Sequence, residues 1–281
     1  MNAQLLGRLS LPGDQGRPNE DRAGAAGCFA WVIDGATGLG DFECLDGPSD
    51  AAWLAETADM AIAARLTVGE TEPAALIAHA IDAAAEAFAR DLVRQPEGRF
   101  QLPTASMLVA RFDGGGIDIA ELGDCSLYAV AADRTVATIG SDAEGRARER
   151  EGARLMIAHG ATLKTPEVRR RMRESRAKRN TPDGAWLFGV EREAAAHVRR
   201  HRLELAAPFT ALLATDGFAA LVQDYGRTDA GGLVEAARLR GLASLGEDLR
   251  AIEQIEDPDC TIFPRFKPSD DATALLVSVA D

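Results

Sequence analysis

The sequence is poor in the residues that build disulfide frameworks, zinc sites and membrane anchors. It contains only four cysteines and four histidines in 281 residues, and the cysteines form no CxxC pair and have no histidine at zinc-ligand spacing. We therefore expect free thiols in a reducing compartment. The N-terminal segment lacks the basic and apolar regions of a signal peptide, and no run reaches the roughly 18 apolar residues of a membrane-spanning helix. A cytoplasmic location is the resulting expectation.

Positive charge is also scarce. The chain carries 31 Lys and Arg against 44 Asp and Glu, a formal net charge of -13. This excess of acid opposes non-specific binding to phosphate backbones or anionic lipid, so we expect neither nucleic acid nor a membrane as a partner. The hydrophobic content of 46% and charged content of 27% are ordinary for a globular protein. The length favours one domain spanning residues 1–281.

The first half of the chain predicts a buried strand, two long helices and a group of short strands. The run CFAWVID at 28–34 is apolar and ends at an Asp-Gly turn. Helical periodicity begins at a Ser49 cap and again after Pro73. Four β-like runs separated by Gly or Asp turns follow, at 105–113, 116–124, 126–133 and 135–140. This spacing is typical of an antiparallel meander.

The second half begins with a polar, Arg-rich stretch at about 141–185, which we interpret as a surface insertion. Strand-like runs return at 186–190, 195–205 and 209–216, helical patterning follows at 217–226, 232–241 and 244–255, and the chain closes with a strand at 272–280. The order is not a strict βαβ alternation, so a parallel doubly wound sheet is not favoured. Antiparallel sheets covered by helices are the predicted architecture.

Carboxylates lie in four short segments, most of them beside apolar runs. They are Glu20 and Asp21 in RPNED, Asp34 in WVIDGATG, Asp216 in LLATDGF and Asp270 in SDDATALLVSV. Each Asp-Gly taken alone is first of all a turn signal. Together they are the hard oxygen donors that Mg²⁺ and Mn²⁺ prefer, and the absence of His and Cys at these points argues against zinc.

The ordered set RPNED, VIDGATG, PTASMLVARF followed by AELGDCSLYAV, LLATDGF and DDATALLVSV resembles the metal-dependent protein phosphatases of type 2C, from about Gly13 to Val279. The resemblance implies an α+β fold, an α/β/β/α sandwich of two antiparallel sheets flanked by helices. It also implies a centre of two Mg²⁺ or Mn²⁺ ions that activates a water for direct hydrolysis of a phosphate ester.

Site residues follow from the same resemblance. Asp34 would bridge both ions, Gly35 would lend its carbonyl, and Asp216 and Asp270 would complete the second site, with Asp34 and Asp216 as the catalytic pair. Glu20 and Asp21 would bind through waters or directly. Asp271 stands where the family often has Asn, and it is the fallback for Asp270.

The chain departs from the family at three positions. Arg17 is the expected phosphate-binding residue, although the family usually has this arginine one residue upstream, where this chain has Gly16. Ala36 replaces a histidine suggested as the general acid. Asp124 matches a carboxylate of a possible third metal, but its usual companion is replaced by Ala220, so we expect two ions with a third weak or absent.

The segment 164–179, KTPEVRRRMRESRAKR, has eight basic and two acidic residues. It is interpreted either as a solvated helix face or as a flap-like segment that attracts anionic phosphosubstrates to the metals. The four histidines are assigned structural roles; they are His79, His159, His197 and His201.

The sequence therefore predicts a Mg²⁺/Mn²⁺-dependent phosphatase of phosphoserine and phosphothreonine. Its partners would be phosphorylated proteins, with a cognate kinase as a further candidate partner, and the oligomeric state stays open. Two alternatives remain, a phosphatase of a small phosphorylated metabolite and a catalytically weak regulatory or binding module on the same fold.

Overall fold

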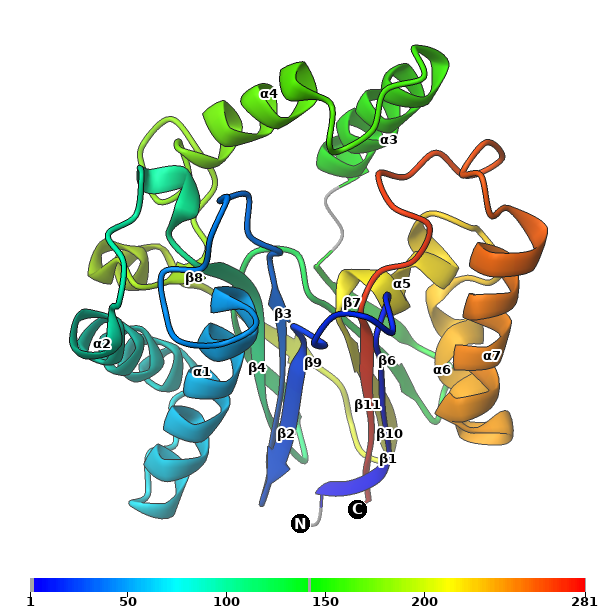
Figure 1. Cartoon of the computed structure of the whole chain (residues 1–281). Coiled ribbons are helices and arrows are strands. Elements are labelled where there is room, and N and C mark those ends of the chain that lie inside the picture. The colour runs from blue at the N-terminus through cyan, green and yellow to red at the C-terminus, as the bar shows by residue number, and fades with distance from the viewer. Residues whose placement is uncertain (1–2, 141–142, 281) are drawn as a thin grey trace.

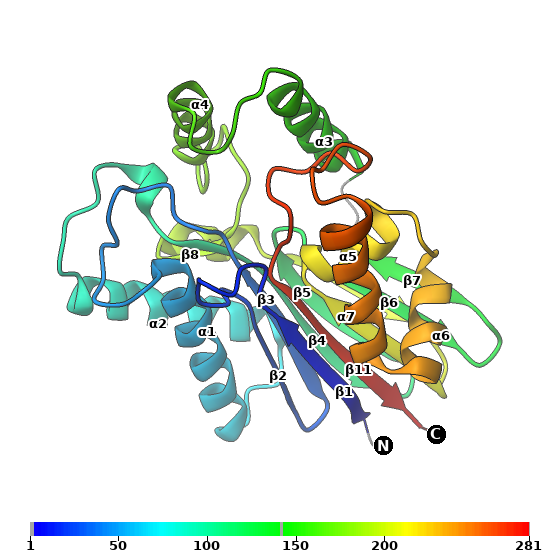
Figure 2. The ribbon, with the colours of Figure 1, turned by 45° about the vertical axis from the view of Figure 1, so that its right-hand side comes forward.

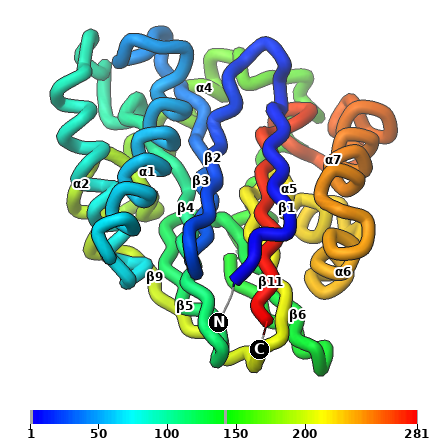
Figure 3. The backbone as a smooth tube through the Cα atoms, turned by 90° about the horizontal axis from the view of Figure 1, so that it is seen from below, coloured from blue at the N-terminus to red at the C-terminus, as the bar shows by residue number. Residues whose placement is uncertain are grey.

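The computed structural model describes residues 3–140 and 143–280. Two antiparallel β-sheets face one another, and each is covered on its outer face by helices (Figure 1). This is the predicted α/β/β/α sandwich, so the expected fold class is confirmed. Seen from below, the strands lie between α1 and α2 on one side and α6 and α7 on the other (Figure 3).

The first sheet has the strand order β2-β3-β4-β5-β9, with β8 paired to β4. Its strands are β2 (Arg22–Ala26), β3 (Phe29–Gly35), β4 (Thr104–Asp113), β5 (Gly116–Leu122), β8 (Phe188–Gly189) and β9 (Arg199–Glu204). Helices α1 (Asp50–Thr67) and α2 (Pro73–Asp91) pack on it through a core that includes Ile33, Leu54 and Ile77. As predicted, Ser49 caps α1, because its side chain accepts a hydrogen bond from Ala52 N at 3.2 Å.

The second sheet has the order β1-β11-β10-β6-β7. Its strands are β1 (Ala3–Leu11), β6 (Ser126–Ala131), β7 (Val136–Ile139), β10 (Phe209–Ala214) and β11 (Ala272–Val279). Helices α5 (Asp216–Gln223), α6 (Ala230–Arg240) and α7 (Leu242–Ala251) cover it. The two sheets bury an apolar layer between them that includes Val32, Leu108, Leu213 and Val277, and its burial contributes hydrophobic stabilisation.

The four runs from 105 to 140 were predicted to form one meander, but they form two hairpins in different sheets. β4 pairs with β5 in the first sheet, and β6 pairs with β7 in the second. The chain changes sheet at Gly123, whose φ of +97° is in the left-handed region. A Cβ there would lie 2.3 Å from the Ser106 hydroxyl. Glycine therefore permits the crossing that separates the two hairpins.

Two strand predictions were too long. The run at 186–190 contributes only the two residues of β8, and in the run at 195–205 the strand is confined to β9. A 3-10 helix, η2 (Arg192–His197), precedes β9, and His197 stacks on Trp186 with ring centroids 3.5 Å apart. This local packing replaces strand pairing for residues before Val198.

The Arg-rich segment forms helices α3 (Ala143–Ala158) and α4 (Pro166–Arg176). Both lie above one end of the two sheets, the end at which β3 finishes (Figures 1 and 2). The remaining elements are two short helices, the 3-10 helix η1 (Arg99–Gln101) and the π-helix η3 (Ile252–Glu256). None of the helices among the described residues is both long enough and apolar enough to cross a membrane.

Candidate active site

The predicted carboxylates meet at the end of the sandwich that lies under α3 and α4. Asp34 is near the end of β3, Asp216 is the first residue of α5 directly after β10, and Asp270 lies just before β11. The two sheets thus contribute to one site. The backbone N–H of Asp216 donates to Asp34 Oδ2 at 3.3 Å, which joins two residues 182 positions apart in the sequence.

The carboxylates of this site perturb one another's ionisation. Burial and then the charge of Asp216 raise the pKa of Asp34 well above its usual value. Burial and then the charges of Asp270 and Asp124 raise the pKa of Asp216 to about 7. Desolvation and like-charge repulsion both disfavour the ionised form, so the site is short of positive charge. Such a cluster in a fold's concave end is a candidate functional site.

Asp21 accepts a hydrogen bond from a residue that follows a strand of the second sheet. Its Oδ2 accepts a hydrogen bond from Thr215 Oγ1 at 2.8 Å, while its buried Oδ1 has no hydrogen-bond partner. Burial is the main cause that raises the Asp21 pKa, and Asp271, Asp270 and Asp216 add to it. A buried carboxylate oxygen without a partner is costly unless it meets a cation or an ordered water.

Glu20 is buried with both carboxylate oxygens engaged. Its Oε1 accepts a hydrogen bond from Ser49 Oγ at 2.5 Å, and its Oε2 accepts one from Thr37 Oγ1. The cap of α1 and the loop after β3 are therefore tied to the same carboxylate. Gly35 lies so close to this residue that a Cβ on it would stand 2.5 Å from the Glu20 carbonyl oxygen.

Asp270 and Asp271 have different surroundings. Both oxygens of Asp271 accept backbone hydrogen bonds, from Gly13 N at 2.7 Å and from Glu20 N at 2.6 Å, so this side chain anchors the loop between β1 and β2. Asp270 instead forms an ion pair with Lys267 at 2.5 Å through Oδ1. The Asp271 side chain is thus committed to structure, which favours Asp270 as the ligand.

The two remaining predicted residues, Asp124 and Arg17, have different surroundings. Asp124 Oδ1 accepts a hydrogen bond from Ser106 Oγ at 2.6 Å, and Ser106 is opposite Asp34 in the β3–β4 register. Arg17 has an exposed side chain in a turn where its backbone N–H donates to Asp14 O. The structure brings Asp124 beside the cluster and leaves Arg17 on the surface.

Arginines of α4 bind the loop that follows Asp34 and Gly35. Arg173 Nε donates to Leu39 O at 2.9 Å, and Arg169 Nη2 donates to Asp41 Oδ1 at 2.8 Å. Arg176 donates to Thr37 O. These side chains are not a solvated helix face, so that interpretation is wrong for them. Arg171, in contrast, is exposed.

Three cations near the carboxylates were not singled out from the sequence. Arg179 Nη1 donates to Thr104 Oγ1 at 2.8 Å, and the charges of Asp124, Glu149 and Asp34 partly offset a lowering of its pKa that burial causes. Arg146 of α3 pairs with Asp224 at 2.9 Å, while its buried Nε and Nη2 have no hydrogen-bond partner. Lys267 is the third. The basic composition of the insertion pointed toward the arginines, but no motif marked Lys267.

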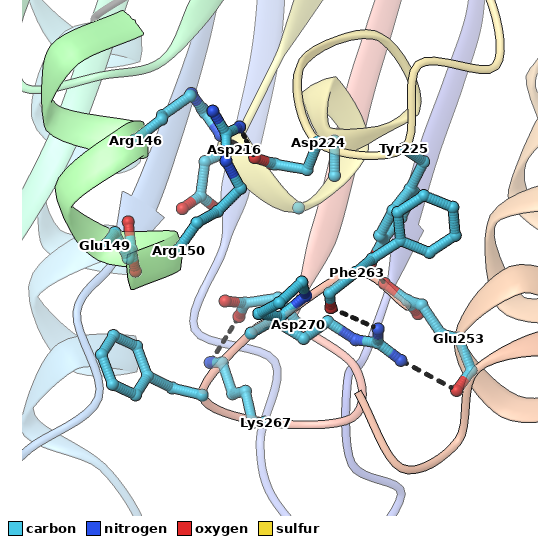
Figure 4. Close-up of a pocket in the computed structure, with 15 residues that line it drawn as sticks. Arg146, Glu149, Arg150, Asp216, Asp224, Tyr225, Glu253, Phe263, Lys267 and Asp270 are labelled. Carbon is cyan, nitrogen blue, oxygen red and sulfur yellow. Dashed lines mark hydrogen bonds and ion pairs between the residues drawn. The ribbon is translucent and has the colours of Figure 1, made fainter. Parts of the chain in front are cut away.

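A cavity opens between α3, the start of α5 and the segment before β11 (Figure 4). Arg146 and Glu149 line it from α3, Asp216 lines it from the start of α5, and Lys267 and Asp270 line it from the segment before β11. Acidic and basic groups therefore face each other across it.

The donor chemistry suits a hard divalent cation, since every candidate donor is oxygen and Asp21 Oδ1 lacks a partner. Across residues 3–140 and 143–280, however, no three His, Cys, Asp or Glu side chains lie close enough together to enclose a metal ion in this conformation.

Comparisons with known proteins agree with this geometry. The family described as Protein phosphatase 2C matches residues 13–240. A search of curated protein sequences finds no significant match. Among solved structures, the serine/threonine phosphatase PstP/Ppp of Mycobacterium tuberculosis is similar at a TM-score of 0.57 and 17% identity, over 100% of both chains.

Two further structures are similar over nearly the full length. The catalytic domain of PstP in complex with two manganese ions has a TM-score of 0.56 and 17% identity, over 100% of this chain and 99% of that one. PppA, described as a key regulatory component of T6SS in Pseudomonas aeruginosa, has a TM-score of 0.54 and 16% identity, over 99% of both. At these identities the likeness concerns the fold. Because the family match covers well over half of the residues, the chain belongs to the protein phosphatase 2C family.

Proposed function

We propose that this protein is a Mg²⁺- or Mn²⁺-dependent phosphatase that hydrolyses phosphoserine and phosphothreonine in proteins. The observation that carries the proposal is the meeting of Asp21, Asp34 and Asp216 from both sheets, with raised pKa values and an unpartnered buried oxygen on Asp21. Such a cluster is stabilised by divalent cations, because they add positive charge to that of the nearby basic side chains and offset the repulsion among the carboxylates.

The proposed ligands are those that the family resemblance implies. Asp34, the Gly35 carbonyl, Asp216 and Asp270 would hold the two ions. Glu20 and Asp21 would bind through waters or directly. When bound, the ions activate a water for direct attack on phosphorus, so no phosphoenzyme is needed. Asp34 and Asp216 hold the reacting centre and are the proposed catalytic pair.

The substrate phosphate would be held by guanidinium groups. Arg17 is exposed and available to a substrate, and Arg179, within the insertion, lies near the carboxylates of Asp34 and Asp124. A planar guanidinium suits the oxygens of a phosphate monoester. Because Ala36 offers no proton donor, solvent would protonate the leaving alcohol. Asp124 would hold a third ion weakly or not at all, because Ala220 offers no carboxylate to assist it.

The substrate class rests on the relatives and on the surroundings of the site. Serine/threonine phosphatases are among the similar structures, and α3 and α4 lie above the site as a surface for a protein substrate (Figure 2). Phosphorylated proteins and a kinase that acts on the same sites are the proposed partners, in the cytoplasm. We propose that residues 1–281 form one catalytic unit in which 141–185 is a flap-like insertion.

The test compares a generic aryl phosphate, a phosphothreonine peptide and a small phosphorylated metabolite after treatment with EDTA. Hydrolysis should return with Mn²⁺ or Mg²⁺ but not with Zn²⁺, since the donors are hard oxygens. The Asp34→Asn variant should lose this activity, while Asp183→Asn, at an exposed position of the insertion, should keep it. Turnover of the metabolite alone would contradict the protein substrate. Metal-independent turnover, or full activity in Asp34→Asn, would contradict the mechanism.

A further inference from the structure

Lys267 brings a positive charge into the carboxylate cluster. Its Nζ lies 2.5 Å from Asp270 Oδ1 (Figure 4). Asp216 lines the same cavity as Lys267 and Asp270, so the ammonium group lies beside two of the aspartates proposed to bind metal.

The segment that carries Lys267 is braced by the protein. Asp257 accepts backbone hydrogen bonds from Thr261, Ile262 and Phe263 at 2.8 to 3.0 Å. Arg265 forms an ion pair with Asp257 at 2.6 Å, and its Nε donates to the Pro268 carbonyl at 2.9 Å. The loop is thus fixed immediately before and after Lys267, which makes the approach of its ammonium group to Asp270 a property of the fold.

Asp270, the acidic partner of this ion pair, is also fixed by hydrogen bonds. Arg250 Nη2 donates to the Asp270 carbonyl at 2.8 Å, and Asp271 N donates to Asp270 Oδ1 at 2.8 Å. Asp270 Oδ1 therefore already receives an ammonium and an amide. A metal ion that binds this oxygen competes with the ammonium, because Oδ1 already receives two donors and the positive charges of the ammonium and the metal ion repel one another.

We propose that Lys267 is a tethered cation that takes the place of a metal ion beside Asp270, and that divalent metal enters the second site in competition with it. This inference rests on the proposed function. Two consequences follow. In the metal-free protein, Lys267 offsets repulsion among the carboxylates and stabilises the fold. In the presence of metal, it raises the concentration needed to fill the site next to Asp216 and Asp270.

The exchange requires little rearrangement. The Lys267 side chain is 42% exposed, so its ammonium group has access to solvent. Its flexible four-carbon stem allows the ammonium to swing into water while the braced loop stays in place. Competition therefore needs a rotamer change and not unfolding of the segment.

The experiment measures Mn²⁺ binding by isothermal titration calorimetry on the full chain after removal of metal with EDTA. The Lys267→Met variant should bind Mn²⁺ at its weaker site about tenfold more tightly than the wild type, which corresponds to about 1.4 kcal/mol. Lys267→Arg keeps the charge and should stay near wild-type affinity. The Lys178→Met variant, at an exposed position of the insertion, serves as the matched control.

A second readout separates competition from a merely structural role. Without metal, Lys267→Met should unfold at a lower urea concentration than the wild type, and saturating Mn²⁺ should remove this difference. Lower stability with unchanged or weaker Mn²⁺ binding would overturn the inference, as would a higher KM for aryl phosphate with unchanged Mn²⁺ affinity, which would make Lys267 a phosphate ligand. If the wild type and Lys267→Met bind Mn²⁺ equally and both hydrolyse substrate normally, this inference is overturned while the proposed function stands. If neither protein binds Mn²⁺, the proposed function fails as well.

Discussion

Neutralising Asp216 should stabilise the metal-free protein while abolishing its activity. The carboxyl group of Asp216 has a pKa of about 7 in the folded chain, against an ordinary value of 3.8, because of burial and then of the charges of Asp270 and Asp124. The folded state therefore binds a proton more tightly than the unfolded state. Below pH 3.8 the group is protonated in both states and does not lower the free energy of unfolding. Above pH 7 it is ionised in both states, and the free energy of unfolding is lowered by the full cost of burying the charge.

The size of this penalty follows from the shift. A change of about 3 pKa units at about 1.4 kcal/mol per unit corresponds to about 4 kcal/mol, and coupling to Asp34 makes this an upper figure for Asp216 alone. In EDTA, the free energy of unfolding of the wild type should fall as pH rises from 4 to 7. The Asp216→Asn variant has no charge to desolvate, so it should lose less stability over this range and exceed the wild type by 1 kcal/mol or more at pH 8.

Urea denaturation followed by circular dichroism between pH 4 and 8, with EDTA and then with Mn²⁺, measures these quantities. Mn²⁺ should reverse the order, because it stabilises the wild type by binding and the Asn variant lacks a ligand charge. Asp183→Asn, at an exposed position, should behave as the wild type in every condition. A variant at Asp216 that is less stable than the wild type in EDTA at pH 8 would refute the reasoning.

Three further variants test the surroundings of the site. Gly35→Ala should lower activity at least 100-fold and cost about 1 to 3 kcal/mol of stability in urea denaturation, because the new Cβ meets the Glu20 carbonyl oxygen at 2.5 Å. Gly47→Ala, which has open space around it, is the control, and equal effects at both positions would contradict this account. Arg171→Glu should raise KM for a phosphopeptide several-fold at low salt and leave aryl phosphate hydrolysis unchanged, an effect that 1 M salt removes; unchanged kinetics on both would exclude substrate attraction by this residue. Arg173→Gln should reduce kcat on both substrates, since it loses its bond to the loop after β3, and a loss confined to the phosphopeptide would show that Arg173 contacts substrate instead.

Local patterns predicted most of the elements. The apolar run before Asp34, the Ser49 cap and the helical period after Pro73 are short-range signals, and the structure has β3, α1 and α2 at those places. The runs around β8 and β9 were extended too far, because a short apolar run does not distinguish a strand from a 3-10 turn packed on the core. Element boundaries depend on such packing.

The site was predicted only in part, because short sequence motifs mark its carboxylates but not the contacts between distant segments. Residues of the quoted motifs, such as Asp34 and Asp216, are found together at one end of the sandwich. Their roles as metal ligands remain predictions. The two neighbouring aspartates before β11 could not be separated by sequence, because both precede the same strand. Only the backbone partners of Asp271, which come from residues more than 250 positions away, distinguish it from Asp270.

The sequence by itself determined the family, the alternation of strands and helices, and the identity of the carboxylates, since each of these is written in short segments of the chain. The tertiary structure decided which sheet each hairpin joins, that arginines of α4 hold the loop after β3, and that Lys267 meets Asp270. Pairings of this kind depend on how distant segments pack in three dimensions, and the energy of one ion pair or one sheet crossing leaves no periodic trace in the sequence.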